Sequence, residues 1–387
     1  KITLPLVLPA ILSAVILTFS KAIGTFGTIN YLGSPVQYYT LSSQLYMNIN
    51  SRDTQTGFAM AILMIIIASI AVFVNQKLIG SRKSYATIGG KGGRSTLIGL
   101  GKVGRPVITA ALFVFFAVGI IMPIVILVME SFMLKEGIYS LDNFTLHYWI
   151  GESNPQIMEG LPGIFKNDEF INSLFNSLRL TLVNGVFGTI FGQLLGYITA
   201  KGRGRLHGKL VEQLVFIPYL IPSVAFGGIY LSMFSQPQQI FGVTLVPALY
   251  GTFALLTLVS VVKHLPFAAR AGTSNMLQIS GELEEAATIE GAGFFRRFVK
   301  IVFPLSKGGF ISGFMLIFVS IMKELDLIIL IMTPTTSTLP YLAFRYQNGN
   351  SPQASDCVAI VMFSIVFLVY AIANLSGKAD LAKSMAG

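Results

Sequence analysis

Four charged side chains lie within or beside stretches that are otherwise strongly apolar: Lys21, Lys323, Glu324 and Asp326. Charge at membrane depth is costly, so such residues usually pair with each other, reach the interface or line a polar cavity. Lys323 and Asp326 are three residues apart and could pair on one face of a helix. On a polar translocation path, the carboxylates of Glu324 and Asp326 would instead suit a hard cation. The two interpretations predict different partners for the same side chains.

A second group of informative residues lies in the connection at residues 263–304. Its first part predicts a short helix with Ser280 as the N-cap, because acidic side chains follow where they favour the positive end of a helix. These acids are Glu282, Glu284 and Glu285. Gly291 and Gly293 interrupt the pattern, so the helix is expected to end before them.

Another short helix is predicted after these glycines, because apolar residues recur there at helical spacing. They are Phe294, Phe295, Phe298 and Ile301, and the polar face carries Arg296, Arg297 and Lys300. Such a pair of helices could lie on lipid or dock to a soluble partner. A helix on lipid usually carries Lys and Arg along its polar face, whereas the first helix is acidic with small alanines. The pattern favours docking.

The sequence shows no pattern typical of a metal site or a disulfide framework. Cys357 is the single cysteine, and the three histidines, His147, His207 and His264, are far apart. Catalytic side chains are not clustered at one membrane depth, which argues against an integral membrane enzyme. We expect the chain to bind no metal and no cofactor of its own.

The elements that must position these residues are membrane helices. Hydrophobic residues make up 53% of the 387 residues and charged residues only 11%, against roughly 25% charged in soluble proteins. The predicted class is an all-α polytopic membrane protein with about eight transmembrane helices. The predicted spans are residues 4–31, 58–74, 107–129, 180–200, 214–234, 245–262, 308–322 and 358–373.

The distribution of charge predicts which connections face the cytoplasm. Residues 77–105 hold seven basic residues and no acid, whereas residues 130–169 hold seven acids and two lysines. Because cytoplasmic loops are enriched in Lys and Arg, the linker 77–106, the loop 263–304 and the tail 377–387 are placed inside, and the segment 130–169 outside. The net charge of +10 is therefore a topology signal, and we expect no nucleic-acid partner. The Gly-rich run at 89–104 lacks a phosphate-loop pattern and is expected to be a flexible linker.

An internal repeat relates the two ends of the chain. The run Lys300-Ile-Val-Phe-Pro-Leu305 resembles Lys1-Ile-Thr-Leu-Pro-Leu6, and an apolar span, an external loop and a final span follow each copy. We infer the end of one unit (residues 1–76) followed by a complete second unit (residues 107–376). Because the chain starts inside the repeated motif, an N-terminal portion of about four spans is expected to precede it.

The cytoplasmic loop resembles a known signature. Glu285-Ala-Ala, Gly291 after three further residues, Ile301 after nine more and then Pro304 are similar to the EAA motif of permease subunits of binding-protein-dependent ABC importers, EAA-x3-G-x9-I-x-LP. Phe303 stands where Leu is usual, and Ile2 to Pro5 match the tail of a first copy. The resemblance implies two repeated type I ABC importer permease units, the first one incomplete, in a bacterial inner membrane.

This resemblance also implies partners and residue roles. A coupling loop at residues 270–304 would dock into a dimer of cytoplasmic ATPase subunits, and an external binding protein would deliver the substrate. The chain has no Walker A sequence, so the partner would hydrolyse ATP. The residues implied in docking or in the join to the following span are Glu285, Ala286, Ala287, Gly291, Ile301 and Pro304, with Ile2 and Pro5 in the first unit.

The fused two-unit arrangement resembles ferric-iron permeases, with Phe26-Gly-Thr-Ile-Asn-Tyr-Leu-Gly33 and Lys323-Glu-Leu325 as shorter matches. Ferric iron is therefore the favoured substrate. Phosphonates, thiamine, polyamines and sulfate stay open as alternatives within the same type of importer. A self-powered secondary transporter is a further alternative that would not need the docking loop.

Overall fold

The computed structural model describes residues 11, 15, 18–19, 21–80, 99–349 and 351–375, and most of them are helical. Ile2, Pro5 and nearly half of the predicted span at residues 4–31 lie outside the described residues, as do most of the predicted linker and the whole tail. The first described elements are α2 (Gly27–Gly33), η1 (Ser34–Val36), α3 (Leu41–Asn50) and α4 (Thr54–Gly80).

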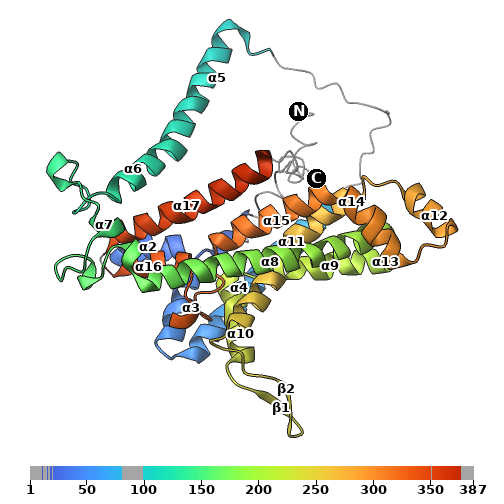
Figure 1. Cartoon of the computed structure of the whole chain (residues 1–387). Coiled ribbons are helices and arrows are strands. Elements are labelled where there is room, and N and C mark those ends of the chain that lie inside the picture. Colours follow the sequence, from blue (N-terminus) through green and yellow to red (C-terminus); the bar gives the residue numbers. More distant parts are fainter. Residues whose placement is uncertain are drawn as a thin grey trace.

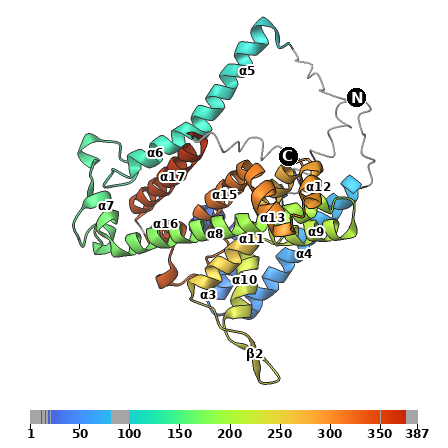
Figure 2. The same cartoon turned by 45° about the vertical axis from the view of Figure 1, so that its right-hand side comes forward.

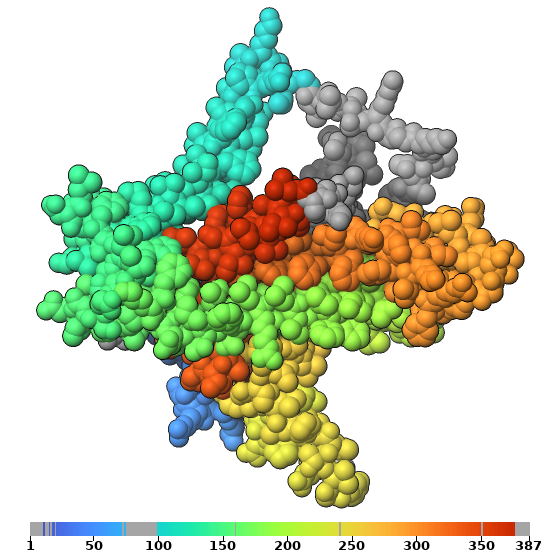
Figure 3. All heavy atoms as spheres, viewed as in Figure 1, coloured from blue at the N-terminus to red at the C-terminus, as the bar shows by residue number. Residues whose placement is uncertain are grey.

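An apolar arm and a folded connection come next. The arm is one helical run, and the connection occupies the segment predicted to be external. Their elements are α5 (Gly101–Phe116), η2 (Ala117–Ile121), α6 (Met122–Glu130), η3 (Leu141–Asn143), α7 (His147–Ile150), η4 (Met158–Gly160) and η5 (Ile164–Lys166). None of the most apolar window of the arm is buried within the chain. Figures 1 and 3 show α5 standing clear of the body, so lipid is its expected surrounding.

The remaining elements form the body of the molecule. They are α8 (Asp168–Lys201), α9 (Leu206–Leu220), α10 (Ser223–Phe234), β1 (Gln238–Ile240), β2 (Val243–Val246), α11 (Phe253–Met276), α12 (Gly281–Ile289), α13 (Phe294–Arg297), η6 (Phe298–Val302), α14 (Phe303–Leu305), α15 (Lys307–Met322), η7 (Pro334–Thr336), α16 (Leu339–Asn348) and α17 (Pro352–Leu375). Five helical runs of the described part are long and apolar enough to span a membrane, or seven with two bent pairs. The all-α membrane class is confirmed, whereas the count of eight spans is not.

The span predicted at residues 214–234 is not one straight helix. α9 and α10 meet at an angle of 98°. Pro222 stands at the break, and Ile221 before it has an extended backbone with ψ of 130°, as expected for a residue that precedes proline. The uncharged run is therefore a broken span.

The boundaries of the span predicted at residues 245–262 are also wrong. Its first residues belong to a hairpin of β1 and β2, whose turn at Phe241 and Gly242 has positive φ at both positions, the geometry of a type I′ turn. Figure 2 shows this hairpin projecting from the body beyond α10. α11 starts at Phe253 and continues to Met276. Lys263 therefore lies inside a helix, and the connection predicted at 263–304 begins after Met276.

The body is built around α8, α11 and α15. Glycines on α8 allow these helices to approach closely: a side chain at Gly192 would lie 2.3 Å from Cβ of Ala268, and one at Gly185 would lie 2.6 Å from the ring of Phe314. Small residues serve this purpose in membrane helices, where packing rather than water exclusion brings helices together. Figure 1 shows α8 extending from the connection around α7 to the region of α12 and α13.

The described elements show the internal repeat as a repeated order of structure. A short 3₁₀ turn, a ten-residue helix and a long apolar helix occur as η1, α3 and α4, and again as η7, α16 and α17. α3 begins at Leu41 and α16 at Leu339, 298 residues later, and each is preceded by a threonine. The two sets are equivalent parts of two units.

Equivalent residues of the two units touch each other. Gly27 N–H donates to Oδ1 of Asp326, 299 residues away, at 2.9 Å, and this separation is the offset of the repeated motif. The rings of Tyr46 and Phe344, 298 residues apart, meet edge-on at 6.3 Å, and Phe26 is fully buried against both. A residue meets its own equivalent only near the axis that relates the two units. These contacts therefore mark a pseudo-two-fold axis.

We predict that Tyr46→Cys and Phe344→Cys can be joined by a short bifunctional thiol reagent in a Cys357→Ser background. A protease site inserted after Gly90 lets the two halves separate unless they are cross-linked. The halves should stay together on a denaturing gel only when both new cysteines are present. The pair Tyr46→Cys and Phe367→Cys is the control, because Phe367 is exposed on α17. Equal cross-linking of both pairs would contradict the axial contact.

Candidate functional site

A cavity of 1090 Å³ lies beside the pseudo-two-fold axis. It is lined by equivalent positions of both units at the 299-residue offset. These pairs are Lys21 with Ser320, Gly24 with Lys323, Thr25 with Glu324, and Gly27 with Asp326. A cavity built in this way belongs to the interface between the units and is open to change when they move relative to each other.

All four charged residues singled out in the sequence line this cavity. The structure does not form the helical pair predicted between Lys323 and Asp326. α15 ends at Met322, so the two residues do not share a helix face, and no ion pair joins them in the described part of the chain. Asp326 instead accepts the hydrogen bond from Gly27, at the start of α2, across the axis.

Glu324 is held by groups of its own unit. Its Oε1 accepts the backbone N–H of Leu327 at 2.9 Å, and its Oε2 lies 3.4 Å from Nε2 of His264. The other ring nitrogen of His264 lies 2.9 Å from the carbonyl oxygen of Ser260. Glu324 therefore stabilises the turn after α15 and links it to α11. The sequence did not point to His264, which lies far along the chain from the other two histidines.

Lys263 donates hydrogen bonds to backbone carbonyls at the break between α9 and α10. Its Nζ donates to the carbonyl oxygen of Pro218 at 2.9 Å and to that of Ile221, and it lies over the ring of Phe226 at 5.2 Å. The last carbonyls of a helix lack partners within the helix and carry partial negative charge, so a buried ammonium satisfies both requirements. The sequence signal for this break was the presence of two prolines, Pro218 and Pro222, in one apolar run. Such a break leaves carbonyl groups that need hydrogen-bond donors.

The connection between α11 and α15 forms a knob at residues 280–302, at the end of the molecule away from α7 (Figure 1). As predicted, Ser280 caps α12: its Oγ accepts the N–H of Glu282 at 3.3 Å. Gly291 has φ of 79°, which ends the helix. The second helix is present as one helical run from Phe294 to Leu305. α13 passes into the wider turn of η6, because Pro304 has no N–H to continue the α-helical pattern.

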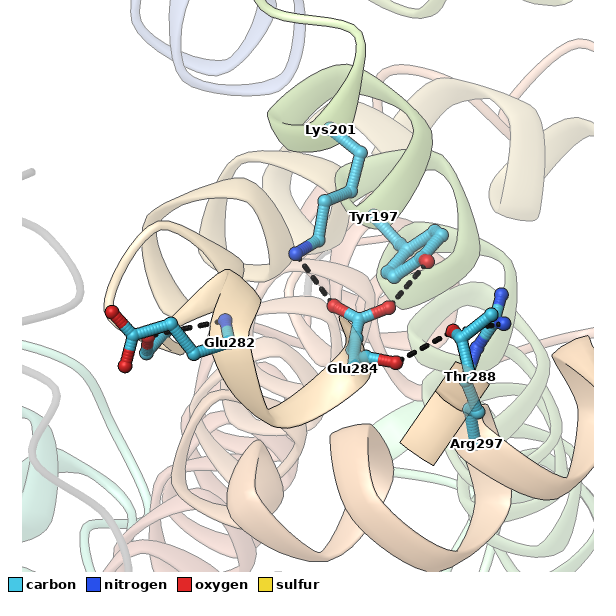
Figure 4. Close-up of polar contacts among 7 residues, drawn as sticks. Tyr197, Lys201, Glu282, Glu284, Thr288 and Arg297 are labelled. Atoms are coloured by element: carbon cyan, nitrogen blue, oxygen red, sulfur yellow. Dashed lines mark hydrogen bonds and ion pairs between the residues drawn. The ribbon is translucent and has the colours of Figure 1, made fainter. Parts of the chain in front are cut away.

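Glu284 anchors the knob to α8 (Figure 4). Its Oε1 lies 2.5 Å from Nζ of Lys201, and its Oε2 accepts the hydroxyl of Tyr197 at 2.6 Å. Thr288 donates to the carbonyl oxygen of Glu284 and accepts from Arg297, which ties the two helices of the knob together. Burial alone would raise the pKa of Glu284, but the hydrogen bonds from Lys201 and Tyr197 and nearby positive charge lower it below its usual value.

The residues implied in docking lie on the other side of the knob. Glu285, Ala286 and Gly291 are exposed and Ala287 is half-buried, whereas Ile301 is half-buried and Pro304 exposed at the join to α15. Three apolar side chains extend the exposed surface, with exposed fractions of 48% for Leu283, 86% for Ile289 and 79% for Phe295. The sequence did not separate the anchoring Glu284 from the outward Glu285. The four-residue spacing between Glu284 and Thr288, which places them on one helix face, was the available signal.

Within the described ranges, no group of three or more His, Cys, Asp or Glu side chains could hold a metal ion. Glu324 and Asp326 line the same cavity, but each engages a backbone N–H. The arrangement thus combines a cavity lined by charged residues with an exposed knob at residues 280–302.

We predict that the knob keeps its anchor from neutral pH down to about pH 5 and loses it in stronger acid. A carboxylate with a lowered pKa stabilises the folded form above its unfolded pKa, and this contribution disappears as the pH falls through the folded value. Glu284→Gln should remove the pH dependence and raise hydrogen exchange of α12 about tenfold at neutral pH. Glu282→Gln, in the same helix but exposed, is the control. Equal exchange in both variants would show that Glu284 is no anchor.

A second prediction concerns the break in the span. Lys263→Met keeps the length of the side chain but leaves the carbonyls of Pro218 and Ile221 without their donor. An unsatisfied buried group costs about 1–3 kcal/mol, so the melting temperature of the purified protein in detergent should fall. Lys263→Arg retains donors and should lose less, while Lys209→Met on the exposed side of α9 should melt like the original. An unchanged melting temperature for Lys263→Met would refute the capping role.

Comparisons with known proteins place these features in a family. The chain is 22% identical to the ferric transport system permease protein FbpB of Actinobacillus pleuropneumoniae over all of its length and 53% of that protein. It is 26% identical to the sulfate transport system permease protein CysT of a Synechocystis strain over 52% of the chain and 71% of the relative. The chain thus spans about half the length of the ferric permeases it matches.

A solved structure and a family profile agree with these relatives. A bacterial ABC transporter that imports the acidic polysaccharide alginate is 16% identical with a TM-score of 0.55, covering 70% of this chain and 94% of that chain, which shows a shared fold. The family profile of the binding-protein-dependent transport system inner membrane component matches residues 1–85 and 188–379. The chain belongs to this family of ABC importer permeases.

Proposed function

We propose that the chain forms the translocation pathway of an ATP-driven importer in a bacterial inner membrane. The observation that carries this function is the cavity lined by equivalent positions of two units, joined to an exposed knob by single helices. α15 begins next to the knob and ends at the charged turn in the cavity, and α8 ends at Lys201, which pairs with Glu284. Movement of the knob is thereby passed to the cavity.

The partners follow from the exposed surfaces and the family. A cytoplasmic ATPase dimer docks on the outward face of α12, where Glu285, Ala286 and Ile289 are accessible. An external binding protein delivers the substrate on the side of residues 130–169. The chain has no Walker A sequence, so ATP is hydrolysed by the partner.

Ferric iron is the proposed cargo. The ferric permease of Actinobacillus pleuropneumoniae aligns with the whole chain, including the part that precedes the second unit, whereas the sulfate and the Thermococcus kodakarensis molybdate/tungstate permeases align with 52% of it. This alignment over the whole chain supports ferric iron over the other cargoes.

Glu285→Arg tests the docking proposal in the complete protein purified from native membranes in mild detergent. The substitution reverses a charge at the proposed contact, and because the side chain is exposed, it should leave folding intact. An ATPase should co-purify with the original and be reduced at least about tenfold with the variant. Glu212→Arg, an exposed carboxylate on α9 outside the knob, should retain the ATPase. If no ATPase accompanies the original, or transport persists without it, a self-powered transporter becomes the better assignment.

A further inference from the structure

The charged groups in the cavity differ in whether they already have hydrogen-bond or ion-pair partners within the protein. Glu324 accepts the N–H of Leu327 and faces His264, Asp326 accepts the N–H of Gly27, and Lys263 donates to two carbonyl oxygens. These three residues supply hydrogen-bond partners to backbone groups where helices break or end. Each of the three therefore already has a partner within the protein.

Two lysines in the same cavity differ from these three residues. Lys21 and Lys323 are exposed and line the cavity. In the described part of the chain, neither forms an ion pair with a carboxylate. Lys21 lies over the ring of Tyr219 at 5.3 Å, which leaves its ammonium directed at the cavity wall without a counter-charge. One lysine comes from each unit, so the free charge faces the passage from both sides of the axis.

The surroundings reinforce this positive potential. α10 begins at Ser223 in the cavity wall, and no side chain caps its positive end. Buried Lys263 lies next to the same wall. Hydroxyl groups of Ser223, Ser320, Tyr219 and Tyr370 also line the cavity and can donate hydrogen bonds. An unshielded trivalent cation would meet the ammonium groups of Lys21 and Lys323, whereas the carboxylates of Glu324 and Asp326 each already accept a backbone N–H.

We propose that this cavity takes cargo whose outer surface is anionic oxygen, bound between Lys21 and Lys323. The proposal rests on the proposed importer function and refines its substrate class. Two sources share this chemistry: a free oxyanion, and a ferric ion enclosed in an anionic oxygen shell. It departs from the expectation that Glu324 and Asp326 serve a bare hard cation.

The test is equilibrium binding to the complete importer, purified with its ATPase and held without nucleotide. The anionic probes are radiolabelled sulfate and molybdate, as free oxyanions, and iron supplied as ferric citrate. Terbium chloride is the bare trivalent cation. One of the anionic probes should be retained, and Lys21→Gln with Lys323→Gln should weaken its binding at least about tenfold, since hydrogen bonds to charged groups are among the stronger ones. Which anionic probe is retained distinguishes the two sources.

Matched variants separate charge from damage to the fold. Lys21→Arg and Lys323→Arg keep the charge and should restore most binding, while Lys135→Gln, exposed in the connection after α6, removes a charge elsewhere and should have no effect. Three results would overturn the proposal: no anionic probe is retained, retention is equal in the Lys→Gln variants, or terbium binds and is lost in Glu324→Gln. ATP hydrolysis by the same preparations is measured in parallel. Intact hydrolysis with failed anion binding refutes the cargo class alone, whereas absence of the ATPase refutes the importer function.

Discussion

A chain dissolved in lipid must provide a partner for every backbone N–H and C=O group, because the surrounding solvent offers none. This constraint is strictest where a helix breaks, and this protein breaks its helices around the cavity. Lys263 satisfies the free carbonyls at the end of α9, Asp326 receives the N–H at the start of α2, and Glu324 receives the N–H of Leu327 after α15. Charged residues therefore supply the hydrogen-bond partners that the irregular backbone around the cavity lacks.

The same constraint assigns roles to charges that look alike in the sequence. A charged group that already satisfies a broken backbone is held in place, because withdrawing it would leave the backbone group without a partner, which is costly in a medium of low dielectric constant. Lys21 and Lys323 differ, since neither ammonium pairs with a carboxylate among the described residues. Among the charged residues that line the cavity, the two without such a partner in the described part of the chain are lysines.

Much of the architecture could be predicted because it depends on local pattern. The spacing of apolar residues and the Ser280 cap predicted the helices of the knob, and charge-free runs predicted the long helices. The repeat of the run from Lys300 to Leu305 predicted two equivalent units. Hydropathy could not reveal the break at Pro222, because a bent span is as apolar as a straight one. Lys263 was misplaced because its charge was taken as the end of a span. Glu284 and Glu285 were not separated because their roles depend on α8, which lies over eighty residues earlier in the chain.

Close packing determines how the knob can act on the cavity. α8 and α11 meet at Gly192 and Ala268 with no room for another atom, so they move together rather than slide past each other. α15 packs against the same pair and carries Lys323 at its end. Lys263, His264 and Glu324 therefore belong to one closely packed wall of the cavity, which Lys21 of the first unit also lines. The two units also meet at the axis through the rings of Phe26, Tyr46 and Phe344 and the hydrogen bond from Gly27 to Asp326, so any change in the separation of the two lysines must alter these contacts.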